Sequence, residues 1–355
     1  MSLFILCRGL NLKKRPIVFI ISLKKNTFAG HYKTMDIDIV YLWVDGSDPM
    51  WRAKKEAFVM GVSCATHEAL DEARFVDSDE LKYSLRSIEL YAPWIRHIYI
   101  VTDGQVPSWI DLTNPRISIV DHTVIMPQEA LPSFSSPAIE WCVDNIPGLS
   151  EHFLLANDDT FIGRTVGPED FFTPQGYPIV RLRKRHKSKK SAETQYMKTL
   201  LRAQAVVKEI FGEACDYIPH HNIDAYWLSD FKQCKTVFAE LVDETINRHF
   251  RHDEDLQRAV VSYYALSIGH GEMKLMGRYN KKSSIAEKVK GTLRGRYYYD
   301  SRSISIGERD IRHVLNRYNP MLFCLNDNEH SSDEDRMRAR QFLEQMFPEK
   351  SSFEI

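Results

Sequence analysis

Short apolar runs that end in polar turns alternate with stretches of helical periodicity from residue 36 onward. Residues 37–44 are apolar and β-rich, and they stop at the polar segment 45–49. Further β-rich runs cover 98–104, 117–120 and 153–156, whereas apolar positions recur at helical spacing in 79–91. Strands that alternate with helices predict an α/β fold with a mostly parallel sheet.

The pattern changes after residue 180. Residues 193–270 are rich in helical periodicity, with predicted helices over 197–210, 225–241 and 255–268. Strand-like runs return at 303–306 and 321–325, followed by a charged helix. We therefore divide the chain into a leader (1–34), an α/β core (35–180), a basic and helical insertion or second lobe (181–300), and a C-terminal strand and helix that complete the core (301–355).

Composition narrows the class of protein. Lys plus Arg total 47 against 48 Asp plus Glu, so nothing favours a nucleic-acid partner. The apolar run 17–23 is far shorter than the roughly 20 residues that span a bilayer, so we expect no transmembrane span and take Met35 as the natural start. The six cysteines are widely spaced, which indicates reduced thiols in a cytoplasmic protein. The sequence does not decide whether the protein binds peripherally to the inner membrane.

Acidic turns follow three of the predicted strands. They contain Asp45 and Asp48, then Asp103, and finally Asp158 and Asp159. In open α/β sheets ligands bind at the carboxyl ends of the strands, so we expect one acidic mouth there. Neighbouring carboxylates can hold a hard divalent cation, although an isolated acidic doublet is more often a turn or helix cap.

Cationic and titratable groups come from the second half of the chain. The segments 219–222, with His220 and His221, and 251–257, with Arg251, supply groups that a phosphoryl-transfer site requires. Two basic runs, 181–190 and 281–296, would suit a polyanionic acceptor, with the tyrosines at 297–299 stacking on sugars. Solvated loops are the commoner reading of such runs.

Taken together, four regions resemble the Stealth family of sugar-phosphate transferases, which includes bacterial capsule enzymes. The first is 37–49, with Trp-Val-Asp-Gly-Ser-Asp-Pro at 43–49. The second, 79–172, contains Glu-Leu-Lys-Tyr-Ser-Leu-Arg-Ser-Ile at 80–88, Phe-Ser-Ser-Pro-Ala-Ile-Glu at 134–140 and Asn-Asp-Asp at 157–159. The third runs from Pro219-His220 to Arg251-His252 and Gln257, and the fourth is Cys-Leu-Asn-Asp-Asn at 324–328.

The resemblance implies a Rossmann-like fold, similar to that of nucleotide-sugar transferases. It also implies transfer of a sugar-1-phosphate from a UDP-sugar or another nucleotide sugar to a hydroxyl of a polysaccharide or glycan, with release of the nucleoside monophosphate in capsule or exopolysaccharide synthesis. On this basis Mg²⁺ or Mn²⁺ is expected on Asp158, Asp159 and Asp327. Donor contacts are expected from Trp43, Gly46, Asp103, Arg86 and Asn326.

The expected catalytic residues are His220, Arg251, Asp45 and Asp48. Arg251 and Arg86 carry guanidinium groups, whose geometry matches phosphate. The doublet at 220–221 leaves the histidine ambiguous, and we favour His220 because it follows Pro219. Among His220, Asp45, Asp48 and Asp103, the sequence does not identify the general base that deprotonates the acceptor hydroxyl.

Two alternative functions remain. An ordinary metal-dependent glycosyltransferase would use the same carboxylates but release UDP. A non-catalytic polyanion-binding protein would use only the basic segments, with the acidic turns serving as local structure.

Overall fold

A computed structural model describes residues 35–59, 75–184, 194–212, 215–276, 300–328 and 330–355. Its central sheet has five strands in the order β3-β2-β1-β4-β8. The strands are β1 (Ile37–Leu42), β2 (Ile98–Thr102), β3 (Ile117–Asp121), β4 (His152–Asn157) and β8 (Asp224–Trp227). The first four are parallel, and β8 is antiparallel to β4. The predicted α/β fold with a mostly parallel sheet is therefore confirmed.

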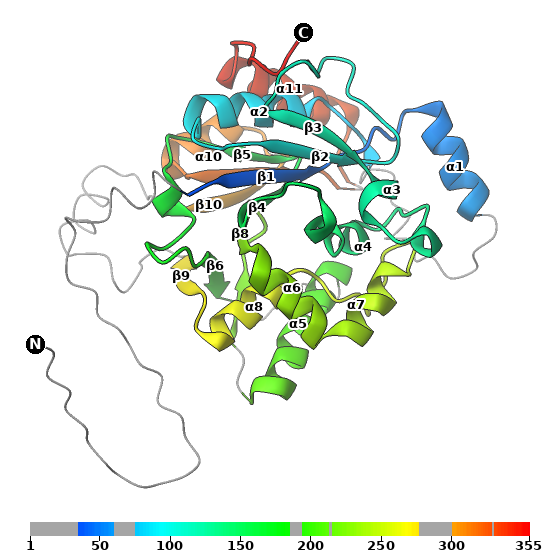
Figure 1. The fold of residues 1–355 in the computed structure, drawn as a ribbon. Coiled ribbons are helices and arrows are strands. Elements are labelled where there is room, and N and C mark those ends of the chain that lie inside the picture. Colours follow the sequence, from blue (N-terminus) through cyan, green and yellow to red (C-terminus); the bar gives the residue numbers. More distant parts are fainter. Residues whose placement is uncertain (1–34, 60–74, 185–193, 213–214, 277–299, 329) are drawn as a thin grey trace, which may run out of the picture.

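Helices cover both faces of this sheet, as expected when strands buried on both sides are nearly all apolar. Helix α2 (Glu80–Tyr91) and helix α11 (Asp333–Met346) lie on one side, and α4 (Ser136–Glu140), α6 (Leu228–Val237) and α8 (Ala259–Ile268) lie on the other (Figure 1). The predicted helix at 79–91 is confirmed, and its Leu81, Leu85 and Ile88 are fully buried. Helix α1 (Pro49–Val59) lies at the edge where β1 and β2 end.

A second sheet joins the C-terminal part of the chain to the strand that follows β4. It has the order β10-β11-β5, formed by β10 (Ser301–Ser305), β11 (Leu322–Asn326) and β5 (Thr160–Ile162). Strand β5 follows β4 after a two-residue turn, and β11 pairs with it in antiparallel register. Phe161 stacks on Phe323 with ring centroids 4.9 Å apart, and α10 (Ile311–Tyr318) packs nearby. The C-terminal strands are thus fixed against the turn between β4 and β5.

The segment after β5 forms a third sheet and a group of helices. The sheet order is β7-β6-β9, from β6 (Ile179–Lys184), β7 (Tyr217–Pro219) and β9 (Glu272–Met276). Helices α5 (Gln195–Phe211), α6, α7 (Ala239–Ile246) and α8 pack together beneath the central sheet. The remaining short elements are α3 (His122–Ile125) and 3-10 turns at Gln128–Ala130, Val143–Asn145 and Pro168–Asp170.

The predicted helix over 225–241 is wrong in its first part. Residues 224–227 form β8, because Ala225 and Tyr226 pack into the sheet beside β4, and the helix begins only at Leu228. The expected boundary between residues 180 and 181 falls inside β6. The leader 1–34, most of the first basic run (185–190) and the second basic run with its tyrosines (281–299) lie outside the described residues.

Two further expectations concern the environment of the protein. Within the described ranges, no helix combines the length and apolar character that a membrane crossing needs. The four cysteines that the structure describes, Cys142, Cys215, Cys234 and Cys324, are free thiols.

Candidate active site

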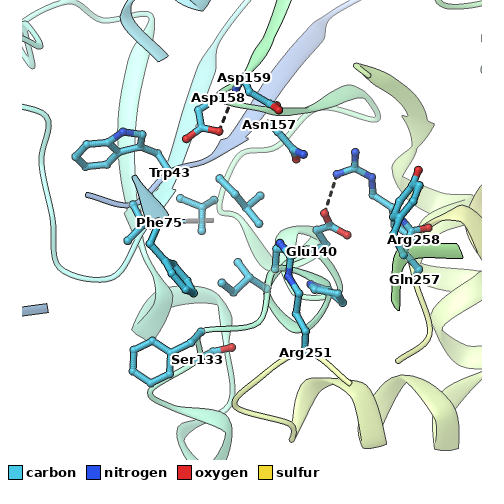
Figure 2. A pocket seen from close by; sticks show the side chains of 18 of the residues that line it. Trp43, Phe75, Ser133, Glu140, Asn157, Asp158, Asp159, Arg251, Gln257 and Arg258 are labelled. Carbon is cyan, nitrogen blue, oxygen red and sulfur yellow. Dashed lines mark hydrogen bonds and ion pairs between the residues drawn. The ribbon is translucent and has the colours of Figure 1, made fainter. Parts of the chain in front are cut away.

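A pocket of about 300 Å³ lies where the carboxyl ends of β1, β2 and β4 meet the end of β11. Parallel strands bring their carboxyl ends to one edge of a sheet, and the loops there form a ligand-binding crevice. Figure 2 shows the Asp158–Asp159 turn at one end of this pocket and Arg251 at the other. The pocket therefore joins residues from separate parts of the chain.

The Asp158–Asp159 turn is held by both strands that it connects. The Thr160 hydroxyl donates to the carbonyl of Asn157 at 2.5 Å, and the Asp159 amide donates to the Asp158 carboxylate at 3.0 Å. From β11, the amide of Leu325 donates to the carbonyl of Asp159 at 3.0 Å. These bonds fix two adjacent carboxylates at the pocket wall.

Four carboxyl groups crowd this end of the pocket. Burial raises the pKa of Asp158 well above its usual value, and its neighbours Asp159, Glu80 and Asp77 raise it further. Burial also raises the pKa of Asp77 to about 6, that of Glu80 to about 8 and that of Asp159 to about 6. Carboxylates that resist ionisation for this reason would be stabilised by a cation between them.

The donor set fits a hard divalent cation. Oxygen ligands are what Mg²⁺ prefers, and one carboxylate oxygen of Asp159, Oδ1, is buried with no hydrogen-bond partner in the part of the chain that the structure describes. The third expected ligand, Asp327, lines the pocket, but Arg336 binds its carboxylate with Nε 2.7 Å from Oδ2. Asp158 and Asp159 are thus the better placed of the three.

Two arginines line the opposite wall. Arg251 donates to the hydroxyl of Ser136 at 2.6 Å. Arg258 is only 3% exposed and binds two carboxylates, Glu140 at 2.9 Å and Asp224 at 3.3 Å. Sequence reasoning predicted Arg251 but missed Arg258 and Glu140, although Glu140 ends a motif quoted above. Their partners lie more than thirty residues away along the chain, so no local pattern revealed them.

The structure places the two histidines of the doublet differently, and the expected role of His220 stays a prediction. His220 does not line the pocket, and its Nδ1 lies 2.9 Å from the hydroxyl of Ser301. His221 lines the pocket, with Nε2 3.3 Å from the amide of Asn157. Burial, with a further contribution from Arg258, lowers the pKa of His221 to about 3, so its imidazole is neutral.

The turn after β1 also departs from expectation, because only Trp43 of its predicted residues lines the pocket. The Asp48 carboxylate accepts from the amides of Met50 and Trp51 at the start of α1, and Asp45 accepts from the Ser47 amide at 2.8 Å. The contacts of both carboxylates shown here are thus local, and their catalytic roles stay predictions.

Gly46, an expected donor contact, lies against the backbone of Phe75. Its amide donates to the carbonyl of Phe75 at 2.7 Å, and an added Cβ would lie 2.4 Å from that oxygen. The absence of a side chain at Gly46 therefore makes room for the chain at Phe75, which lines the pocket.

Of the three remaining predicted donor contacts, Asp103 and Asn326 line the pocket. Lys54 forms an ion pair with Asp103 at 2.8 Å. Arg86 is absent from the pocket wall, because its guanidinium forms two hydrogen bonds with the carboxylate of Glu354, at 2.7 and 2.6 Å. The donor contact expected of Arg86 therefore gains no support from the pocket lining and stays a prediction.

An aromatic surface forms another part of the wall. It consists of Trp43, Trp51, Phe75 and Phe134, and the ring of Trp51 lies 5.1 Å from that of Phe75 and 5.6 Å from that of Phe134. Aromatic rings are suited to stacking on bases or sugar faces. Of these four, sequence reasoning singled out only Trp43.

The fold and the pocket together define an α/β protein with a polar ligand site at the carboxyl edge of a parallel sheet. Comparison with known proteins identifies its family. Residues 35–62 match conserved region 1 of Stealth proteins, and residues 74–180 match conserved region 2. The chain belongs to the Stealth family.

Several relatives of this chain are named polysaccharide phosphotransferases. A capsular polysaccharide phosphotransferase of Haemophilus influenzae is 30% identical over 84% of this chain and 79% of its own length. Two exopolysaccharide phosphotransferases of Streptomyces coelicolor are 50% identical over 39% of this chain and 32% identical over 91% of it. The chain spans 24% and 52% of the lengths of these two Streptomyces proteins.

Solved structures give a weaker likeness. The galactosyltransferase LgtC, in complex with donor and acceptor sugar analogues, aligns over 89% of this chain and 96% of its own, at 10% identity and a TM-score of 0.41.

Proposed function

We propose that this protein transfers a sugar-1-phosphate from a nucleotide sugar, a UDP-sugar in the first instance, to a hydroxyl of a polysaccharide or glycan. The product is a phosphodiester, and the nucleoside monophosphate leaves. One observation carries the proposal: the carboxylates of Asp158 and Asp159 share a single pocket with Arg251, Arg258 and His221. Capsule or exopolysaccharide synthesis is the corresponding process, since the relatives named above carry those names.

The acidic end would hold the cation. Asp158 and Asp159 are the residues that would bind Mg²⁺ or Mn²⁺, and such an ion, when bound to the donor diphosphate, neutralises charge on the departing monophosphate. In the absence of an ion, the ionised forms of Asp158 and Glu80 are disfavoured, because burial raises the pKa of both. A cation bound among these carboxyl groups would favour their ionised forms, so metal binding would release protons.

The basic end would hold the phosphoryl group. Arg251 donates to a serine hydroxyl at the pocket wall, and its planar guanidinium matches the oxygens of a phosphoryl group better than an ammonium would. Arg258 is held by Glu140 and Asp224, so it adds positive potential from a fixed position. Preorganised charge of this kind stabilises the transition state of phosphoryl transfer.

His221 is the proposed proton acceptor. An acceptor hydroxyl must lose its proton as the phosphodiester forms, and a neutral imidazole can take it at Nδ1 or Nε2. The neighbouring arginines help to keep the imidazole unprotonated in the free protein. Entry of an anionic diphosphate would offset that positive charge and make the imidazole a stronger base at the moment of transfer.

The aromatic surface would position the donor. Trp43 and Phe75 lie near the end of β1 and flank the acidic turn in the pocket (Figure 2). A nucleoside stacked on this surface would place its diphosphate between the carboxylates and the arginines.

The free thiols described above suit the reducing cytoplasm, which we propose as the place of reaction.

The decisive experiment identifies the released nucleotide. Purified protein is incubated with a panel of nucleotide sugars and a polysaccharide acceptor, and the products are separated by ion-exchange chromatography. We expect UMP, loss of turnover in EDTA and recovery with Mn²⁺. Release of UDP would instead establish an ordinary glycosyltransferase.

Two variants separate a catalytic acidic turn from a structural one. Asp158→Asn should lose turnover while remaining folded. Asp45→Asn is the matched control, because Asp45 lies outside the pocket lining and its oxygen contact to the Ser47 amide survives the change. Native turnover in Asp158→Asn would refute the proposed role of the turn, whereas no turnover in the native protein would leave polyanion binding as the function to test.

A further inference from the structure

Three potential metal ligands of different chemistry meet beside the acidic turn. A carboxylate oxygen of Asp159, a ring nitrogen of His221 and Sγ of Cys324 all lie within 4.8 Å of one another. They come from the turn after β4, the loop after β7 and strand β11. Strand β11 pairs with β5 directly after the turn, and β7 pairs with β6, so the ligands are brought together by the fold rather than by sequence proximity.

Contacts around the thiol show that the site is enclosed and polar. Cys324 is fully buried, and its Sγ lies 3.0 Å from Oδ2 of Asp159 and 3.3 Å from Oδ1 of Asn326. The other oxygen of Asp159, Oδ1, is buried and makes no hydrogen bond to any described residue. An unsatisfied buried carboxylate oxygen is costly unless a ligand completes it.

The donor types select the metal. One nitrogen, one sulfur and one carboxylate oxygen are characteristic zinc ligands, whereas Mg²⁺ and Ca²⁺ are bound through oxygen alone. Ligands at Zn²⁺ distances in a tetrahedron are about 3.4 to 3.6 Å apart, so side-chain shifts on the order of 1 Å would close the site. The oxygen of Asn326 or a water would take the fourth position.

We propose that Asp159, His221 and Cys324 form a zinc-binding site, distinct in its ligands from the oxygen site proposed for Mg²⁺ or Mn²⁺. Zn²⁺ enters as the thiol proton leaves to solvent, so an S–H bond is exchanged for a zinc–thiolate bond with no change of oxidation state. The imidazole binds in its neutral form, and thiolate and imidazole ligands favour Zn²⁺ over Mn²⁺.

The two sites share Asp159, and this has a consequence that rests on the proposed function. Zn²⁺ bound by the three residues occupies a carboxylate needed for the hard cation and the imidazole proposed as proton acceptor. Zinc should therefore inhibit transfer even when Mn²⁺ is in large excess.

Cobalt provides a test that does not depend on activity. Metal-free protein is titrated with Co²⁺, which replaces zinc and reports thiolate ligation through a charge-transfer band in the near ultraviolet. We expect this band at one equivalent, its loss on adding Zn²⁺, and its absence in Cys324→Ser. Cys234→Ser is the matched control, since Cys234 is also a buried free thiol but is not one of the three clustered ligands.

Zinc affinity, measured by competition with a chromophoric chelator, should fall by at least about 100-fold in Cys324→Ser and in His221→Gln, since even outer-shell changes cost 10- to 100-fold. A cobalt band that persists in Cys324→Ser, or native protein without a band, would overturn the proposal. Circular dichroism of each variant checks that it is folded. If the band is present but no nucleotide is released from any donor, the zinc site stands and the proposed transfer fails.

Discussion

Replacing Arg86 with methionine should destabilise the fold and leave donor binding intact. The side chains of Arg86 and Glu354 are only 10% and 3% exposed, and they form a two-bond ion pair between α2 and the C-terminal segment. Arg86 also donates to the carbonyl of Phe347 at 2.8 Å. Methionine retains much of the aliphatic stem but removes all four hydrogen bonds of the guanidinium, including one to the carbonyl of Pro348, and leaves Glu354 buried without its cation.

The size of the effect follows from this geometry. Removing one partner of a buried ion pair costs about 3–5 kcal/mol. The entropy of unfolding is about 2.1 cal/mol/K per residue near the melting temperature, or about 0.75 kcal/mol/K for this chain of 355 residues. The melting temperature should therefore fall by about 4 to 7 °C.

Thermal unfolding by circular dichroism measures the shift, and titration calorimetry measures donor affinity in the same variant. The control is Glu354→Gln, alone and combined with Arg86→Met. The double variant should be less destabilised than the sum of the single ones, because both changes remove the same interaction. A native melting temperature with weakened donor binding in Arg86→Met would refute the reasoning and restore the role that the sequence suggested.

Three further predictions concern the pocket. Asp158→Asn should lower turnover by on the order of 10²- to 10³-fold. Without metal, this variant should melt no lower than the native protein at pH 8, because burial and neighbouring carboxylates disfavour the ionised form of Asp158. A lower melting temperature would contradict this. His221→Gln should lower kcat by about 10²- to 10⁴-fold, whereas His220→Gln should leave kcat within a few-fold, and steady-state kinetics that reverse this order would return the role to His220. Burial raises the pKa of Glu80 to about 8 in the folded protein. In EDTA, the stability contributed by the protonated Glu80 side chain is therefore complete below pH 4.5 and is lost as pH rises through 8. The melting temperature of native protein should therefore fall relative to that of Glu80→Gln between pH 6 and 9, and parallel curves would rule out the shift.

Much of the fold could be predicted because its signals are local. The central strands are apolar runs stopped by polar turns, and α2 shows clear helical periodicity, so both were predicted correctly. Strand β8 was missed, since Ala225, Tyr226 and Trp227 precede a real helix and continue its apolar character. Only its pairing with β4 makes this segment a strand.

The candidate site was predictable where strand topology determined it. Asp103, Asp158 and Asp159 face one pocket because parallel strands end at one edge. The same strand-end argument predicted Asp48 in the site, but its carboxylate accepts hydrogen bonds from backbone amides at the start of α1, as aspartates near helix starts often do. No sequence pattern distinguishes these two outcomes.

Pairings across long separations were the least accessible to sequence reasoning. Arg258 lies 118 residues from Glu140, and Arg86 lies 268 residues from Glu354. An arginine has the same local signature whether it faces a phosphate or a carboxylate, so its partner decides its role.

The Asp158–Asp159 turn connects two sheets, and this affects when the pocket can form during synthesis of the chain. Strand β4 precedes the turn in the five-stranded sheet, whereas β5 after it pairs with β11, whose Leu325 amide holds the carbonyl of Asp159. On a translating ribosome, the acidic turn reaches its final geometry only after residues 322–326 have emerged. A prematurely terminated chain therefore contains both carboxylates but lacks the strand that fixes them, and unfinished protein carries no completed pocket.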